Sequence, residues 1–264
     1  MEGTAQLFQH RSASRFTTDH EKGLLIAHVA AMLLDSLVSR THCYLEHPEW
    51  VALYRSLAED YDPPFLHTRS SLVINLKATL LRLPGLWHDV DEAVNRSNFL
   101  THNAPAKSLE PRCHTIHSEI VDHFTAYQIH CRSLPSHIQL PESEFTTRRE
   151  FEGLALSCFI ITKYIIATIC EEERHAFVAG AQAAAHLIVN LHQQQSSSLA
   201  WLYSGMQVLL ANVIIRNKTQ WEEDLGGETL QIQRLASRSR YNMWSNSLGR
   251  RRVDEVAVIP GQEV

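Results

Sequence analysis

The segment from 114 to 131, HTIHSEIVDHFTAYQIHC, carries four histidines, two carboxylates and a tyrosine, which are the residue types of an acid–base site. Steps of three and four residues place His123, Tyr127 and His130 on one face of a helix. A neutral imidazole exchanges protons close to physiological pH. We therefore expect a catalytic proton or hydrogen-bond donor among His117, His123, Tyr127 and His130.

The same pattern is also typical of a half-exposed amphipathic helix whose histidines form hydrogen bonds with their neighbours. A metal site would need three converging ligands, and the five cysteines contain no C-x-x-C pair. Glu172-x-x-His175 has the spacing of half a di-iron site, but the second copy that such a site needs is missing. The chain has no G-x-G-x-x-G, P-loop or G-x-S-x-G motif. We therefore expect no bound metal and no cofactor.

Aromatic residues at helical spacing usually belong to a core, but some of them are also suited to enclose an apolar ligand between helices. We expect Trp50, Phe124, Trp201 and Tyr203 to form such substrate-binding walls. A shaped apolar pocket accelerates a unimolecular ring closure by holding a reactive conformer, helped by one polarising hydrogen bond. The partner of such a site would be a small apolar metabolite.

These residues must be positioned by helices, because apolar residues recur at steps of three and four over most of the chain. Thr18-x-x-Glu21 is a capping box that opens a helix from about 20 to 45. Further helices are expected around Trp50, over 70–83 with Pro84-Gly85 as the stop, and over 86–100, 114–131, 149–170, 171–192 and 199–221. Glycine (10) and proline (9) are scarce for a β-sandwich. The sequence predicts an all-α fold, an irregular bundle of about eight helices.

The domain organisation follows from a change in composition near the C-terminus. We expect a single all-α unit over 1–227. The segment 228–264 is basic at first, with Arg234, Arg238 and Arg240, and acidic at its end. It is expected to form a partly disordered tail.

Several segments resemble the regulatory domain of fungal zinc-cluster transcription factors. The residues that follow the family's order near the N-terminus are Leu7, His10-Arg11, Leu34, Arg40, Leu45, Glu49 and Trp50. AAAHLIVNL (183–191) and MQVLLANVIIRNKTQWEEDL (206–225) resemble the family's last long helices, and Trp244 with Leu248-Gly249-Arg250 resembles its closing segment. The resemblance implies a helical regulatory domain. The family's hallmark of six cysteines, which holds two zinc ions and reads DNA, is missing from this chain, as are the domain's usual first helices.

The net charge of the chain indicates which kinds of partner it can bind. With 24 basic and 29 acidic residues the formal charge is −5, whereas phosphate binding needs a basic footprint, so we expect no specific binding to DNA. The most apolar stretch, 154–169, is interrupted by Lys163 and is shorter than the roughly 20 residues of a membrane span. We expect no membrane contact and an intracellular, cytoplasmic location, or a nuclear one if the chain regulates transcription.

Two classes of function stay open. In the first, the chain is a stand-alone protein of fungal secondary metabolism that promotes a cofactor-free, pericyclase-like cyclisation or isomerisation of an apolar metabolite. In the second, it is a transcriptional regulator or co-regulator that binds a metabolite or a partner protein but not DNA.

Overall fold

The structure is a computed structural model that describes residues 12–59, 65–96, 99, 104–134, 139–193, 201–223 and 229–249, without the side chains of 201–204, 230 and 249. Of the described residues, 84% are helical and none lies in a strand. The expected all-α bundle of about eight helices is therefore confirmed.

The elements of the described residues are all helical. They are η1 (Ala13–Arg15), α2 (Asp19–Ser39), η2 (Tyr44–Glu46), α3 (Pro48–Arg55), α4 (Ser71–Leu80), α5 (Leu83–Asn95), α6 (Ala104–Lys107), α7 (Glu110–Ser133), α8 (Glu142–Ile169), η3 (Glu171–Glu173), α9 (Arg174–Gln193), α10 (Trp201–Arg216), α11 (Lys218–Glu222) and α12 (Leu230–Gly249).

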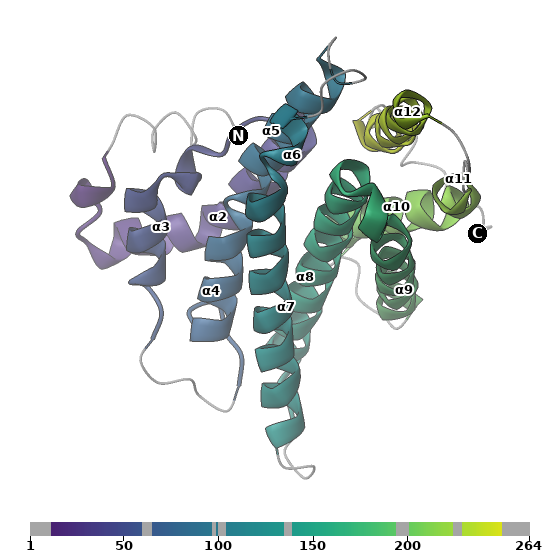
Figure 1. Cartoon of the computed structure of the whole chain (residues 1–264). Coiled ribbons are helices and arrows are strands. Elements are labelled where there is room, and N and C mark those ends of the chain that lie inside the picture. Colours follow the sequence, from purple (N-terminus) through teal and green to yellow (C-terminus); the bar gives the residue numbers. More distant parts are fainter. Residues whose placement is uncertain are drawn as a thin grey trace, which may run out of the picture.

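Helix α8 is the centre of the main core. Its second half is apolar on nearly every side, and from Leu156 to Ile169 only Phe159 and Lys163 are not fully buried. Helices α7 and α9 pack along α8. Figure 1 shows α2, α3 and α4 on one side of the α7–α8 pair and α9 to α12 on the other. A helix that is hydrophobic all round must be enclosed in this way.

A second apolar core lies among η1, α2, η2, α3 and α4. Leu25 and Ile74 are fully buried there. Trp50 lies in the same core, with its ring edge-on to Phe16 at 5.1 Å and to Tyr44 at 5.9 Å. The N-terminal helices thus have an apolar core of their own in addition to their contacts with the main core.

The start of α2 lies where its capping residues predicted it, whereas other helix ends differ from the prediction. The expected capping box is present: the Thr18 hydroxyl accepts from the Glu21 backbone N–H, and Glu21 accepts from the Thr18 backbone N–H. Helix α2 nevertheless ends at Ser39 rather than near 45, because Arg40 takes the left-handed conformation with φ 51°. Pro84, expected as a stop, stands in the first turn of α5, where its missing N–H is not needed.

The expected tail from 228 contains a folded helix, which corrects the boundary drawn at 227. Helix α12 places Tyr241 and Trp244 in the main core, both with no exposed surface. Trp244 stacks on Trp87 of α5 at 5.3 Å and packs on Tyr164 of α8 at 5.2 Å. Charge pattern alone suggested a solvated segment, whereas the apolar positions between the arginines fix this helix to the bundle. Residues 250–264 lie outside the described residues.

Helices α2 and α8 are long and apolar enough, by length and composition, to cross a membrane. In α8, 78% of the apolar window is buried inside the protein, which is the environment of a core helix. In α2 only 28% is buried. The absence of membrane contact and the intracellular location therefore stay predictions.

Candidate functional site

The histidines of α7 form hydrogen bonds with neighbouring helices. His117 is half-buried between Phe159 and Phe177, and its Nδ1 lies 3.0 Å from the Thr162 hydroxyl oxygen. Since that hydroxyl donates to the Phe159 carbonyl, the imidazole Nδ1–H donates to Thr162. Burial, with help from the nearby cation of Lys163, lowers the pKa of His117 to about 4, so this imidazole is neutral at pH 7.

His123 and Tyr127 face other neighbours. His123 Nε2 donates to the Thr79 hydroxyl of α4 at 3.1 Å, and that hydroxyl donates in turn to Glu119 at 2.9 Å. The Tyr127 hydroxyl donates to Glu152 of α8 at 2.5 Å. Burial first, and then this carboxylate, raise the pKa of Tyr127. Both groups are held by protein partners rather than turned toward a shared cavity.

His130 is half-buried in the last turn of α7, and its buried Nε2 has no hydrogen-bond partner among the described residues. The four predicted donors thus do not converge on one of the described cavities: none of them lines one. The alternative reading of the sequence, a helix whose histidines bond to their neighbours, describes His117 and His123.

The predicted aromatic walls are also dispersed. Trp50 is enclosed in the N-terminal core. Phe124 lines a shallow hollow of about 290 Å³ among α7, α8 and α9, together with Lys163. The side chains of Trp201 and Tyr203 lie outside the described residues.

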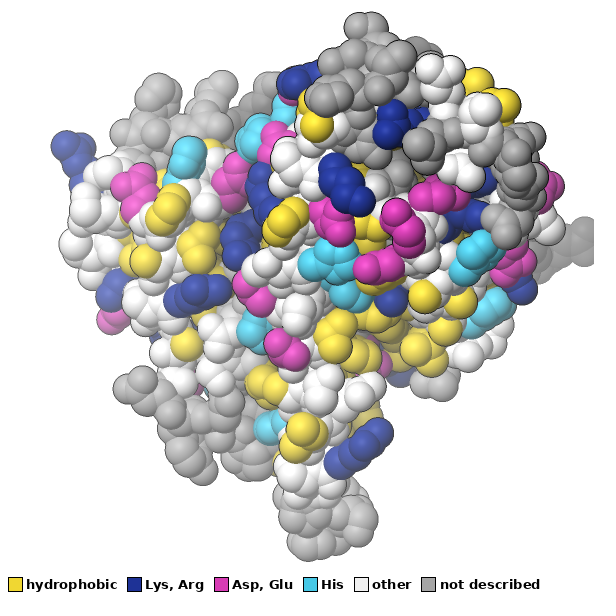
Figure 2. Space-filling view, in the orientation of Figure 1, with side chains coloured by type: hydrophobic (Ala, Val, Ile, Leu, Met, Phe, Trp, Pro, Cys, Tyr) yellow, Lys and Arg dark blue, Asp and Glu magenta, His cyan; other side chains and the backbone are white. Residues whose placement is uncertain are grey.

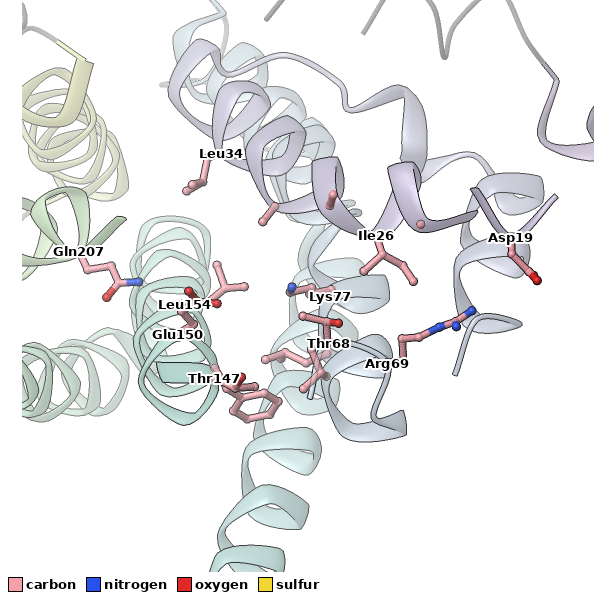
Figure 3. A pocket seen from close by; sticks show the side chains of 16 residues that line it. Asp19, Ile26, Leu34, Thr68, Arg69, Lys77, Thr147, Glu150, Leu154 and Gln207 are labelled. Carbon is pink, nitrogen blue, oxygen red and sulfur yellow. The ribbon is translucent and has the colours of Figure 1, made fainter. Parts of the chain in front are cut away.

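The largest described cavity, about 490 Å³, lies among α2, α4, α8 and the side of α10. Its walls are formed mainly by apolar side chains. The lining side chains with apolar surface are Ile26, Ala27, Ala30, Leu34, Val73, Leu76, Phe151 and Leu154. Figure 3 shows Leu34 and Ile26 descending from α2 above Leu154 of α8 and Lys77 of α4. Ligand pockets of proteins have volumes of about 300–1,000 Å³, so this cavity has the size of a small-molecule site.

Lys77 is the cation in the middle of this cavity. It extends from α4 toward α8, where Glu150 and Leu154 lie (Figure 3). Burial lowers the pKa of Lys77, while the negative charge of Glu150 raises it in part. Within the described part of the chain, no carboxylate lies within ion-pair distance of this ammonium. A partly desolvated ammonium that faces apolar side chains is a strong hydrogen-bond donor for an incoming oxygen.

Polar residues also mark the two ends of the cavity. Asp19 and Arg69 lie at one end and Gln207 of α10 at the other (Figure 3). Gln207 lies directly against Gly153 of α8, where a Cβ atom would stand 2.1 Å from its Oε1. Glycine at 153 is therefore what allows α10 to bring this amide to the cavity.

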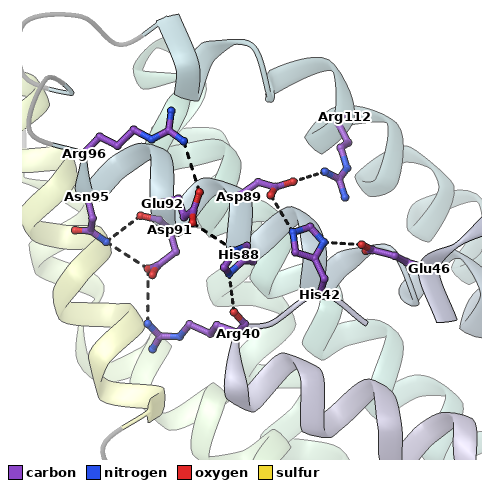
Figure 4. A network of polar contacts seen from close by, with 10 residues as sticks. All are labelled: Arg40, His42, Glu46, His88, Asp89, Asp91, Glu92, Asn95, Arg96 and Arg112. Carbon is purple, nitrogen blue, oxygen red and sulfur yellow. Dashed lines mark hydrogen bonds and ion pairs between the residues drawn. The ribbon is translucent and has the colours of Figure 1, made fainter. Parts of the chain in front are cut away.

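A titratable network, drawn in Figure 4, joins the end of α2 to α5 and α7. His42 bonds to Glu46 at 2.5 Å and to Asp89 at 3.2 Å, and Arg112 of α7 donates to the same Asp89 at 2.5 Å. The Glu46 hydrogen bond is the main reason why the pKa of His42 is raised. Arg40 belongs to the same network and also donates to the Ser245 carbonyl of α12. These pairs connect four segments of the bundle and line no large cavity.

Three possible metal-ligand atoms gather elsewhere. Glu110 and His114 of α7 and Cys170 after α8 place one such atom each within 4.8 Å of the others. None of these residues lines the cavity.

Sequence reasoning missed Lys77 and Glu150 because neither belongs to a motif and the two residues are 73 positions apart in the sequence. One signal was present: Lys77 is the single charged residue in the apolar run from Ser71 to Leu81. A charge within an otherwise buried helix indicates a partner or a cavity.

Comparison with protein-family models, with curated proteins and with solved structures gives no match to this chain. The resemblance to zinc-cluster regulatory domains therefore stays an expectation from the residues quoted for it.

Proposed function

We propose that this protein binds a small, mostly apolar metabolite among α2, α4, α8 and α10 and promotes its cofactor-free cyclisation or isomerisation there. The observation that carries the proposal is Lys77, a half-buried ammonium facing an apolar cavity of ligand size. The donor expected on α7 is thereby reassigned to α4.

A cofactor-free cyclisation requires a cavity of suitable shape and one hydrogen-bond donor. The apolar walls hold a flexible substrate in a conformation close to ring closure. The Lys77 ammonium donates a hydrogen bond to a carbonyl or carboxylate oxygen on which negative charge grows in the transition state. The opposing carboxylate of Glu150 favours the charged form of Lys77. Loss of one such donor costs about 10²–10³-fold in rate.

The resemblance to a regulatory domain favours a second candidate, in which the same cavity holds a metabolite that controls a regulator. Four residues on which the resemblance depends have structural roles in this chain. Arg40 ends α2, and three others are buried: Leu45, Trp50 and Trp244. These structural roles are compatible with either function and do not decide between them.

Deletion of the gene in its host, followed by metabolite and transcript profiling, separates the candidates. We expect one late, uncyclised intermediate to accumulate while the transcripts of its pathway persist. Complementation with Lys77→Met should leave that intermediate in place, whereas Lys163→Met, which changes a half-buried lysine outside the cavity, should restore the parental profile. Loss of the whole pathway together with its transcripts would instead identify a regulator.

A further inference from the structure

A histidine, a buried cysteine and carboxylates meet where the start of α7 lies against the junction of α8 and α9. Glu110 and His114 are four residues apart on α7 and so share a face. Cys170, 2% exposed, follows the last residue of α8. One oxygen, one imidazole nitrogen and the sulfur lie within 4.8 Å of one another. Figure 2 shows histidines and carboxylates side by side on this face of the molecule.

We propose that Glu110, His114 and Cys170 form a binding site for one zinc ion that fastens α7 to the α8–α9 junction. A thiolate, an imidazole and a carboxylate are the ligands that Zn²⁺ takes in proteins, whereas Mg²⁺ and Ca²⁺ take oxygen ligands alone. This inference is independent of the metabolite cavity.

The three ligand atoms must move closer together by about 1 Å to bind one zinc ion. Zn–N and Zn–S bonds of about 2.0 and 2.3 Å set tetrahedral ligand atoms roughly 3.5 Å apart, against the 4.8 Å limit found here. The side chains of Glu110 and His114 are 29% and 36% exposed, so both lie at the surface rather than in the core. A fourth oxygen is near, since Glu173 Oε2 of η3 lies 3.8 Å from His114 Nε2.

The charges around the cluster favour a cation. Glu110 and Glu173 contribute two negative charges, and Lys107, 3.8 Å from Glu110, contributes one positive charge. Zinc binding would replace the Cys170 thiol proton, which passes to solvent, so the affinity should rise with pH.

No zinc motif is visible in the sequence because the ligands stand at 110, 114 and 170, and only the fold brings them together. This inference therefore departs from the expectation of no bound metal, which rested on the absence of closely spaced cysteines.

Metal titration of the purified full chain, stripped with a chelator, tests the site. We expect one equivalent of Co²⁺ to bind with a thiolate-to-cobalt charge-transfer band in the near ultraviolet, and Zn²⁺ to displace it. Cys170→Ser should abolish the band. Glu110→Gln and His114→Gln should each weaken binding by more than the roughly 10–100-fold that loss of a supporting residue costs.

Two matched variants serve as controls. Cys131→Ser changes a thiol at the other end of α7, and His186→Gln changes an exposed histidine of α9; both should bind cobalt as the parent does. Circular dichroism checks the fold of each variant, and if Cys170→Ser does not fold, the half-exposed Glu110→Gln decides. The proposal is overturned if the parent shows no saturable cobalt or zinc binding, or if the cluster variants bind as the controls do.

Discussion

Two histidines of this protein respond to their surroundings in opposite ways. His117 is held neutral by burial between two phenylalanines and by the cation of Lys163. His42 stands in a carboxylate network that favours its charged form. The two histidines should therefore change the free energy of unfolding with pH in opposite directions. Substitution of each histidine measures this effect directly.

For His117, we expect stability to fall as the pH falls. Its pKa is about 4 in the folded protein and about 6.5 when unfolded, so between these values the unfolded chain binds more protons. His117→Gln keeps a hydrogen-bond donor for Thr162 and does not titrate. The free energy of unfolding of the parent, relative to this variant, should decrease by about 1 kcal/mol from pH 7 to pH 5, with allowance for solvent screening. A difference that stays constant over this range would contradict the assignment.

The residue types on α7 were predictable from the sequence, but their partners were not. Spacing places His117, His123 and Tyr127 on helix faces, yet which helix lies opposite depends on packing between distant segments. The partners Thr162, Thr79 and Glu152 come from α8 and α4. Hydrogen bonds to these partners occupy three of the four predicted donors, all but His130. Lys77, which belongs to no motif, lines the cavity instead.

At the scale of elements, local sequence signals predicted where the helices lie more accurately than where they begin and end. Periodic apolar residues located the long helices, and the capping box fixed the start of α2. Helices α7 and α8 begin earlier than expected, at Glu110 and Glu142, because their first turns are polar and carry no periodic signal. Helix α12 was missed since its arginines obscured the apolar positions that reach the core.

The network between α2, α5 and α7 predicts a second pH effect. The raised pKa of His42 means that its stabilising contribution is complete below about pH 6.5 and is lost as the pH rises through the higher folded-state value. His42→Gln should therefore cost more stability at pH 5.5 than at pH 8.5, by a few tenths of a kcal/mol, because the pair is partly exposed. Urea unfolding at both pH values measures this. The exposed His186→Gln is the control, and equal costs of His42→Gln at both pH values would refute the effect.

The described part of the molecule consists of two apolar cores, a cavity among α2, α4, α8 and α10, and the C-terminal helix α12, which packs on the main core. Trp244 links α12 to α5 and α8 through its contacts with Trp87 and Tyr164. If α12 belongs to the folded domain, removal of this side chain must destabilise the entire bundle in one cooperative transition.

Trp244→Ala should accordingly lower the free energy of unfolding by about 3–5 kcal/mol, the range for large buried aromatic residues, and Trp244→Phe by less. Leu235→Ala, at a position that is 53% exposed on the same helix, should stay within about 0.5 kcal/mol of the parent. Chemical unfolding followed by circular dichroism measures both. If Trp244→Ala is as stable as the parent, α12 does not contribute to the stability of the bundle and this prediction is wrong.

The central claim is that the cavity with Lys77 binds an apolar ligand that carries an oxygen anion or a carbonyl. Titration with 8-anilinonaphthalene-1-sulfonate, an apolar fluorophore with one anionic group, tests it most directly. We expect one saturable site in the parent. Lys77→Met should weaken binding by about 10–100-fold, the value of a hydrogen bond to a charged group, and Ala30→Phe should block the cavity by filling it.

Two variants separate this site from adventitious binding of the dye. Lys163→Met changes another half-buried lysine, and Ala126→Phe adds the same ring on an exposed position of α7. Both should bind the probe as the parent does. If Lys77→Met and Ala30→Phe also retain parental binding, or if the parent has no saturable site, the cavity is not the ligand site and the account is contradicted.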